Sequence, residues 1–151
     1  MIHSITKQMM TETGHRLTNY NGKCAHLHGH SYRWEVTAES RDGALDDRGM
    51  VGDFSELKGV MKLIIGEFDH AFLFSQHDPF VQHDEFWLLV KSTEGESGRV
   101  FIFDWNPTAE NMAAHVLNKM QNLVAKMPFR IVKVRVWETA TSCAEVVSNV
   151  R

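Results

Sequence analysis

The chain has 151 residues, of which 43% are hydrophobic and 23% are charged, and its formal net charge at pH 7 is −3. This length suits one hydrophobic core, so we expect a single domain over residues 1–151. A mildly acidic chain without a basic run argues against a nucleic-acid partner, and its apolar runs fall short of the roughly 20 residues of a membrane span.

The start of the chain lacks the charged-then-apolar pattern of a secretory signal. Two cysteines without an export signal predict reduced thiols and a cytoplasmic location. Nine histidines are many for this length. Four of them belong to no further pattern, and we interpret these four as surface residues: His3, His77, His83 and His115.

The first predicted element is a strand within residues 1–20 that leads into a loop and ends near His15. Asn21-Gly22 is typical of a turn, here within residues 19–23. Such a turn would return the chain alongside the first strand and bring His15 close to the residues that follow. A lone histidine is more often structural than a ligand, so His15 needs partners to become a candidate site residue.

Cys24 opens a seven-residue stretch that also contains three histidines. From residue 31 to residue 38 apolar and polar side chains alternate, which predicts a half-buried strand. If the alternation extends backwards, His28 and His30 lie on the apolar face, because side chains two apart in a strand point the same way. Two imidazoles on one face can bind the same metal ion, and His15 is the best upstream candidate for a third ligand.

Asp53 is expected to open a helix, because Glu56 stands three residues later, as a capping box requires. Residues 50–52 before it are expected to return briefly to the sheet. Asp69-His70 would close the helix, with the histidine either stabilised by the helix dipole or forming part of a catalytic pair. The apolar positions of this helix recur at three-and-four spacing and predict a buried stripe of Phe54, Leu57, Met61, Ile64 and Phe68.

Residues 75–105 carry weaker patterns. Residues 86–90 and 99–103 predict two short strands, and residues 92–98 between them are rich in turn residues. We therefore expect a hairpin in this region.

Pro107 predicts that a second helix begins at residues 106–108, and Pro128 predicts that it has ended. Its buried stripe is expected to consist of Met112, Val116, Met120 and Leu123, widened by Ala113, Leu117 and Val124.

Residues 130–138 predict a strand in which Glu138 continues a face of three valines. A carboxylate at this place either reaches solvent at the strand end or contacts a pocket, and we favour the pocket. The tail, residues 140–151, carries no clear pattern, and Cys143 is expected to be inert because its spacing from Cys24 matches no metal motif.

The predicted order is strand, strand, helix, short hairpin, helix, strand. Two helices that pack on one face of an antiparallel sheet satisfy this order, so the expected fold class is α+β.

Six blocks of residues follow one another along the chain. They are His15-Arg16-Leu17, Lys23-Cys24 with His28-Gly29-His30-Ser31-Tyr32, Gly49 to Lys58, Asp69-His70, Pro107-Thr108 with Glu110-Asn111, and Val136-Trp137-Glu138-Thr139. In this order they resemble the 6-pyruvoyltetrahydropterin synthase / 6-carboxytetrahydropterin synthase family. His-Gly-His alone would be a weak signal, but six ordered blocks between residues 15 and 139 cover nearly the whole chain.

The resemblance implies a tunnelling fold, in which a four-stranded antiparallel sheet carries two helices on one face. It also implies a homo-oligomer: trimers whose sheets form a barrel, and pairs of trimers that form a hexamer. The implied substrate is the small-molecule pterin 7,8-dihydroneopterin triphosphate. The implied products are 6-carboxytetrahydropterin, acetaldehyde and triphosphate, on the route to 7-deazaguanines such as queuosine.

The resemblance also implies roles for nine residues. The implied zinc ligands are His15, His28 and His30. The implied proton-transfer residues are Cys24, Asp69 and His70. The implied substrate-binding residues are Glu138, which would hold the pterin, with Glu110 and Thr108. These roles agree with the chemistry of the side chains, since three histidines leave zinc an open position and a thiol beside a metal can act as a general base.

Within the family, the three-residue gap between Cys24 and His28 resembles the bacterial carboxy branch. The alternatives are pyruvoyl-type triphosphate elimination, side-chain cleavage that feeds folate synthesis, or a non-catalytic zinc-binding assembly protein. Cys24 argues against the cleavage enzymes, which tend to carry glutamate near this position.

Three features depart from the family pattern. Thr13-Gly14 stand where the family usually has alanine-type residues, and residues 71–74 read Ala-Phe-Leu-Phe instead of the commoner polar-leucine-asparagine run. The segment 75–105 is a longer insertion than in compact bacterial members.

Overall fold

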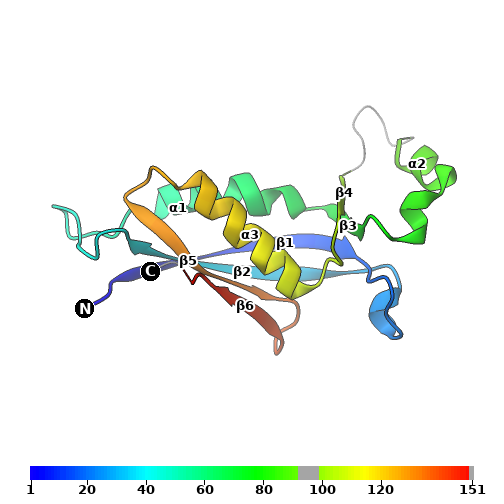
Figure 1. The fold of residues 1–151 in the computed structure, drawn as a ribbon, viewed down its shortest axis with the longest axis horizontal. Helices are drawn as coiled ribbons and strands as arrows, with labels where there is room; N and C mark the ends of the chain where they lie inside the picture. Colours follow the sequence, from blue (N-terminus) through cyan, green and yellow to red (C-terminus); the bar gives the residue numbers. More distant parts are fainter. Residues whose placement is uncertain (92–98, 150–151) are drawn as a thin grey trace.

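The computed structural model describes residues 1–91 and 99–149. Its strands form one sheet in the order β4-β3-β1-β2-β5-β6. In Figure 1, α1 and α3 cover one face of this sheet, and α2 lies at the end of the molecule near β3 and β4. The strands are β1 (Ser4–His15), β2 (His28–Ser40), β3 (Ala71–Ser75), β4 (Val100–Phe103), β5 (Phe129–Trp137) and β6 (Cys143–Val147).

The helices are α1 (Phe54–Ile64), α2 (Asp84–Lys91) and α3 (Ala109–Leu123), with short 3₁₀ turns η1 (Lys23–Ala25), η2 (Ile65–Phe68) and η3 (Pro79–Gln82). None of the helices in this described part of the chain has the length and apolar character of a membrane span.

The α+β class is confirmed, whereas the expected four-stranded antiparallel sheet is wrong for this chain. The observed sheet has six strands and is mixed, because β3 pairs in parallel with both β1 and β4. The strand β3 begins directly after His70, whose positive φ of 54° redirects the chain. The strand β6 lies in the tail after residue 140, for which the sequence predicts no element, and it pairs antiparallel with β5.

The hairpin of β1 and β2 is confirmed and extends over twelve paired positions from Ser4 opposite Glu39 to His15 opposite His28. Side chains of β2 alternate as the sequence predicts, and Trp34 is fully buried beneath the helices. Its indole nitrogen donates to the Thr11 hydroxyl at 3.0 Å, which satisfies the polar end of a buried ring. This regular pairing carries the register without interruption to the two histidines at the end of the hairpin.

Residues Asp53 and Glu56 form the predicted capping box at the start of α1. The predicted stripe is confirmed at its centre, since Leu57 and Met61 are fully buried. It is wrong at its start, because Phe54 is 52% exposed. The helix ends earlier than expected and tightens into η2, and the predicted short strand at residues 50–52 does not form.

Helix α3 begins where predicted, with the Thr108 hydroxyl accepting from the backbone N–H of Asn111. Its buried stripe is confirmed except at Leu123, which is 45% exposed in the last turn. His115 on this helix is half-buried beside the rings of Phe103 and Trp105, so the surface interpretation of His115 is wrong.

The strand β5 contains one extra residue relative to β2. Thr37 lies opposite Lys133 but Ala38 lies opposite Ile131, so Val132 forms a bulge. The bulge changes which residues face the helices: Ile131 is buried on one side of it and Val134 on the other, whereas Val132 is half-buried. The predicted three-valine face is therefore wrong at Val132.

The hairpin predicted within residues 75–105 is wrong. Residues 86–90 lie in helix α2 instead of a strand, whereas the predicted strand at residues 99–103 is confirmed as β4. The strand β4 pairs in parallel with β3, so these two strands do not form a hairpin. The predicted turn at residues 92–98 lies outside the described residues.

Gly14 and Phe72 lie opposite each other where β1 pairs with β3. A Cβ atom at Gly14 would lie 2.3 Å from the Phe72 ring, a distance at which one of the two would have to move. The absent side chain therefore makes room for the ring.

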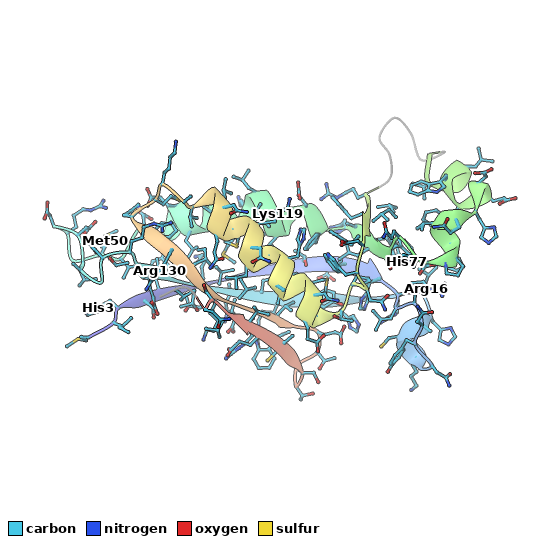
Figure 2. All side chains as sticks on the ribbon, in the orientation of Figure 1. His3, Arg16, Met50, His77, Lys119 and Arg130 are labelled. Carbon is cyan, nitrogen blue, oxygen red and sulfur yellow. The ribbon has the colours of Figure 1, made fainter. Side chains whose placement is uncertain are left out.

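The segment after β3 is fixed to the rest of the fold by an ion pair. Asp78 is fully buried and its Oδ2 lies 3.1 Å from the Nε of Arg16, the residue that follows His15. The Arg16 guanidinium also lies 4.3 Å above the centre of the Phe80 ring. Figure 2 labels Arg16 at this end of the molecule.

We expect Asp78→Asn to destabilise the fold by about 3 kcal/mol, because it leaves a largely buried Arg16 without its charge partner. The amide can still accept from the Phe80 backbone N–H, which now donates to Asp78 Oδ1 at 2.9 Å, so the turn cap is kept. Urea unfolding followed by circular dichroism measures the change. The control is Arg48→Gln, whose exposed ion pair with Asp46 should contribute little. Equal stability of Asp78→Asn and the wild type would contradict the expectation.

Candidate active site and metal centre

Three histidines meet at one end of the β1–β2 hairpin. His15 ends β1, and His28 and His30 begin β2 on the same face, so the parity prediction is confirmed. One ring nitrogen of each lies within 4.8 Å of the others, which is close enough for all three to bind one metal ion.

Hydrogen bonds orient two of these rings for metal binding. His15 Nδ1 lies 2.7 Å from the carbonyl oxygen of Pro107, and His28 Nδ1 lies 2.7 Å from that of His26. A carbonyl only accepts, so each Nδ1 carries the proton and each Nε2 offers a lone pair. This is the arrangement that metal-ligating histidines usually show. The Nε2 of His15 also lies 3.1 Å from the Tyr32 hydroxyl.

The unsatisfied nitrogens fit a metal. The Nε2 atoms of His28 and His30 are buried and accept no hydrogen bond within the described parts of the chain. Burial lowers the pKa of His15 and of His30, which favours the neutral form that binds metal. The three histidines therefore form a site that could hold a metal ion, with room for a fourth ligand.

Glu138 follows β5 and turns toward the histidines. Its Oε1 lies 3.6 Å from the Nε2 of His15 and 3.6 Å from that of His30, and it accepts a hydrogen bond from the Tyr32 hydroxyl at 3.1 Å. Tyr32 is fully buried, and burial together with the negative charge of Glu138 raises its pKa, so the hydroxyl stays protonated and can donate. The sequence allowed Glu138 either to reach solvent or to contact a pocket, and we favoured the pocket. In the structure Glu138 lines a pocket.

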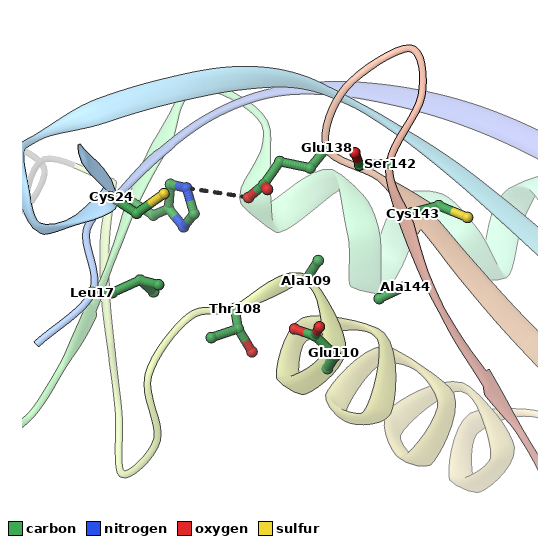
Figure 3. A pocket seen from close by; sticks show the side chains of 10 residues that line it. Leu17, Cys24, Thr108, Ala109, Glu110, Glu138, Ser142, Cys143 and Ala144 are labelled. Carbon is green, nitrogen blue, oxygen red and sulfur yellow. Dashed lines mark ion pairs between the residues drawn. The ribbon is translucent and has the colours of Figure 1, made fainter. Parts of the chain in front are cut away.

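Figure 3 shows this pocket, with a dashed line between His15 and Glu138. Cys24, half-buried and carried by η1, lies on the histidine side. Thr108 and Glu110 line another wall, at the start of α3. The complete lining consists of His15, Leu17, Cys24, Thr108, Ala109, Glu110, Glu138, Ser142, Cys143 and Ala144. The pocket thus combines one metal-ligand candidate, two thiols and two carboxylates.

Asp69 and His70 form a pair but do not line this pocket. Asp69 Oδ2 lies 3.2 Å from His70 Nδ1, and Asp69 Oδ1 accepts from the Glu12 backbone N–H at 2.9 Å. That backbone hydrogen bond, more than the neighbouring histidine, lowers the pKa of Asp69. The His70 side chain is 76% exposed. Within one chain the structure therefore does not bring this pair to Cys24.

Sequence reasoning missed two parts of the site. One is Tyr32, which shares the strand parity of His28 and His30; a buried tyrosine hydroxyl usually requires a partner, and this parity is the signal that could have placed it beside them. The other part is residues 142–144, at the start of β6, where the sequence carried no clear strand pattern.

The family profile described as 6-pyruvoyl tetrahydropterin synthase matches residues 4–149. The chain belongs to this family. Relatives within the 6-pyruvoyl tetrahydropterin synthase family include two proteins named 6-carboxy-5,6,7,8-tetrahydropterin synthase. The one from Rickettsia bellii is 32% identical and the alignment covers 93% of this chain and 97% of the relative. The one from Aquifex aeolicus is 33% identical, with 93% and 95% covered.

Solved structures support the fold of the family. An uncharacterized protein from Wolinella succinogenes superposes with a TM-score of 0.81 at 23% identity, over 99% of each chain. The 6-pyruvoyl tetrahydropterin synthase of Caenorhabditis elegans superposes with a TM-score of 0.66 at 21% identity, over 99% of this chain and 97% of the other.

We expect His28→Ala to weaken metal binding severely, with zinc as the probe, because it removes one of three converging nitrogens. Titration with a chromophoric zinc chelator as competitor measures the affinity. The matched control is His26→Ala, which removes a neighbouring imidazole outside the cluster and keeps the backbone carbonyl that contacts His28 Nδ1. Full zinc affinity in folded His28→Ala would remove this residue from the metal site.

Proposed function

We propose that the protein is a zinc-dependent 6-carboxytetrahydropterin synthase, which converts 7,8-dihydroneopterin triphosphate to 6-carboxytetrahydropterin, acetaldehyde and triphosphate. The observation that carries the proposal is the cluster of three histidines, of which His15 lines a pocket together with Cys24, Glu110 and Glu138. The relatives named for this activity, which align with 93% of the chain, support it. The products feed 7-deazaguanine synthesis, and we assign the protein to the cytoplasm.

The metal, when bound by His15, His28 and His30, would supply a Lewis acid for the hydroxyl oxygens of the substrate side chain. Cys24 reaches the pocket from η1 and is proposed to take and return protons at the side-chain carbons. The thiolate is the form of a cysteine that accepts a proton.

The aminopyrimidine edge of a pterin offers N–H donors, which a carboxylate can accept as a pair. This edge lies at the opposite end of the bicyclic ring from the side chain that reacts. A carboxylate that holds the ring therefore has to lie away from the histidines. Glu110, on the α3 wall of the pocket, satisfies this requirement better than Glu138, whose Oε1 lies 3.6 Å from two of them. We therefore propose Glu110 as the principal ring anchor, assisted by Thr108, with Glu138 contacting the substrate nearer the metal.

Asp69 and His70 are proposed to act on the substrate of a neighbouring subunit. The pair is preformed and exposed but lies outside the pocket of its own chain, as expected if a second copy completes the site. We propose a homohexamer built from two trimers, in which the open faces of the sheets line a barrel. Residues 1–151 would form one domain, with an insertion near residues 75–105.

The test is incubation of the zinc-loaded protein with 7,8-dihydroneopterin triphosphate, with identification of the products by mass. Release of acetaldehyde with 6-carboxytetrahydropterin supports the proposal. Triphosphate release with a pyruvoyl pterin would assign the chain to the elimination reaction instead. Absence of turnover in a zinc-loaded oligomer would favour a non-catalytic zinc-binding protein.

A further inference from the structure

The turn that carries Asp69 and His70 is exposed and strained. The side chains of Asp69 and His70 are 43% and 76% exposed, so packing contributes little to their positions. His70 also has a positive φ of 54°, which is unfavourable for a residue with a Cβ atom and persists only where the surroundings fix it. The geometry of the pair therefore depends on the hydrogen bonds that hold the turn.

The strand β1 holds one side of this turn through Glu12. The His70 backbone N–H donates to the Glu12 carbonyl at 2.7 Å, and the Glu12 N–H donates to Asp69 Oδ1 at 2.9 Å. These bonds fix the Asp69 side chain, whose other oxygen lies 3.2 Å from His70 Nδ1. They leave the carbonyls of Gly66, Glu67 and Asp69 to other partners.

Arg99 binds those three carbonyls. Its Nη2 donates to Gly66 at 3.0 Å and to Glu67 at 2.8 Å, and its Nε donates to Asp69 at 2.9 Å. The last carbonyls of a helix have no partner within the helix, and a planar guanidinium can bind several of them at once. The cation also lies at the negative end of the continuous helical segment formed by α1 and η2, which is favourable.

The sheet fixes Arg99 itself. Its carbonyl accepts from the Phe72 backbone N–H at 2.8 Å, and the next residue, Val100, begins β4 opposite Phe72. Figure 1 shows β3 and β4 side by side at this end of the molecule. Since β3 begins directly after His70, Arg99 contacts the chain both where it enters the turn and where it leaves it.

We propose that Arg99 is a positioning residue for proton transfer by His70, because its three hydrogen bonds fix the turn in which Asp69 orients the His70 ring. This inference rests on the proposed function and deepens it, since it gives a residue of the proposed insertion near residues 75–105 a role in the reaction. Within the described part of the chain Arg99 does not line the pocket, so its effect is expected in kcat and not in substrate binding.

The first test is steady-state kinetics of zinc-loaded Arg99→Ala. We expect kcat to fall about 10- to 100-fold with KM nearly unchanged, because a small displacement of a reacting group can cost this much. Arg99→Lys keeps the charge but cannot present the planar fork of donors, so it should recover only part of the loss. Full kcat in Arg99→Lys would assign the effect to charge instead of to these hydrogen bonds and would overturn the proposal.

The matched control is Arg41→Ala. Arg41 binds the end of α3 in the same manner, since its Nη2 donates to the Val124 carbonyl at 2.8 Å and its Nε donates to that of Met127 at 2.9 Å. It follows the end of β2 that is opposite the histidines, so its removal should lower stability and leave kcat unchanged. Equal losses of kcat in the two variants would show general destabilisation and would overturn the positioning role.

A double-mutant cycle tests whether Arg99 acts through His70. If it does, Arg99→Ala should cost little in a chain that already carries His70→Ala. Losses that multiply in the double variant would show that the two residues act independently and would overturn the proposal.

Hydrogen–deuterium exchange of the peptide that spans residues 66–72 gives a readout that does not require turnover. Exchange should be faster in Arg99→Ala than in the wild type and unchanged in Arg41→Ala. Wild-type exchange in Arg99→Ala would overturn the inference. Absence of turnover in the zinc-loaded wild type would overturn the proposed function instead, so the two failures are distinguishable.

Discussion

Cys24→Ala should lose about 10²–10⁴-fold in turnover, because a positioned general acid or base usually contributes that much. The variant should keep its fold and its zinc. The thiol is half-buried in the pocket that also contains Glu138 and the first of the three histidines, so it can reach a substrate side chain there. It is not part of the histidine cluster, and its removal should leave the metal in place. Steady-state kinetics and metal analysis of the same preparation measure the two properties.

Cys143 provides a matched control within the same pocket. It lines the cavity from the start of β6 but is exposed, and Figure 3 shows it at the far end from Cys24. Cys143→Ala should therefore be nearly silent. Equal losses in the two variants, or normal turnover in zinc-loaded Cys24→Ala, would exclude a specific role for the Cys24 thiol.

Co-expressed Cys24→Ala and His70→Ala chains should regain activity that neither variant has alone. Asp69 and His70 lie outside the pocket of their own chain, so each complete site is expected to combine Cys24 of one subunit with His70 of another. With random mixing, about a quarter of the sites would receive both intact residues. Purification through two different tags, followed by activity measurement, gives the recovered fraction.

The control for this experiment combines Cys24→Ala with His28→Ala. Both residues belong to the same chain's side of the pocket, so mixed oligomers should recover nothing. If the Cys24→Ala and His70→Ala mixture also recovered nothing while its chains did assemble, the active site would be complete within one subunit.

The histidine cluster was predictable because it depends on local order. Strand parity places His28 and His30 on one face, and a hairpin register that the long alternation fixes brings His15 opposite His28. The same parity reasoning failed for the burial of Val132, because a bulge inserts one residue into β5. The pattern of apolar residues does not indicate this bulge.

Other misses have different physical causes. A continuous apolar run at residues 86–90 is compatible with either a strand or a helix, and the structure has helix α2 there. The strand β3 was not predicted because only two residues separate it from η2, and they do not form a typical turn sequence. For Asp69 and His70 the sequence indicated a pair, and the structure has it, but outside the pocket that Cys24 lines.

The contact between Gly14 and Phe72 links two departures from the family pattern that lie far apart in the sequence. A side chain at residue 14 and a phenylalanine at residue 72 compete for the same space, since the added Cβ would lie 2.3 Å from the ring. A side chain at residue 14 therefore requires the Phe72 ring to turn away from β1. Among relatives, an alanine at the position of Gly14 should occur with a smaller or differently oriented residue at the position of Phe72. The strand that ends in His15 and the strand that follows His70 are in this sense coupled through one packing contact.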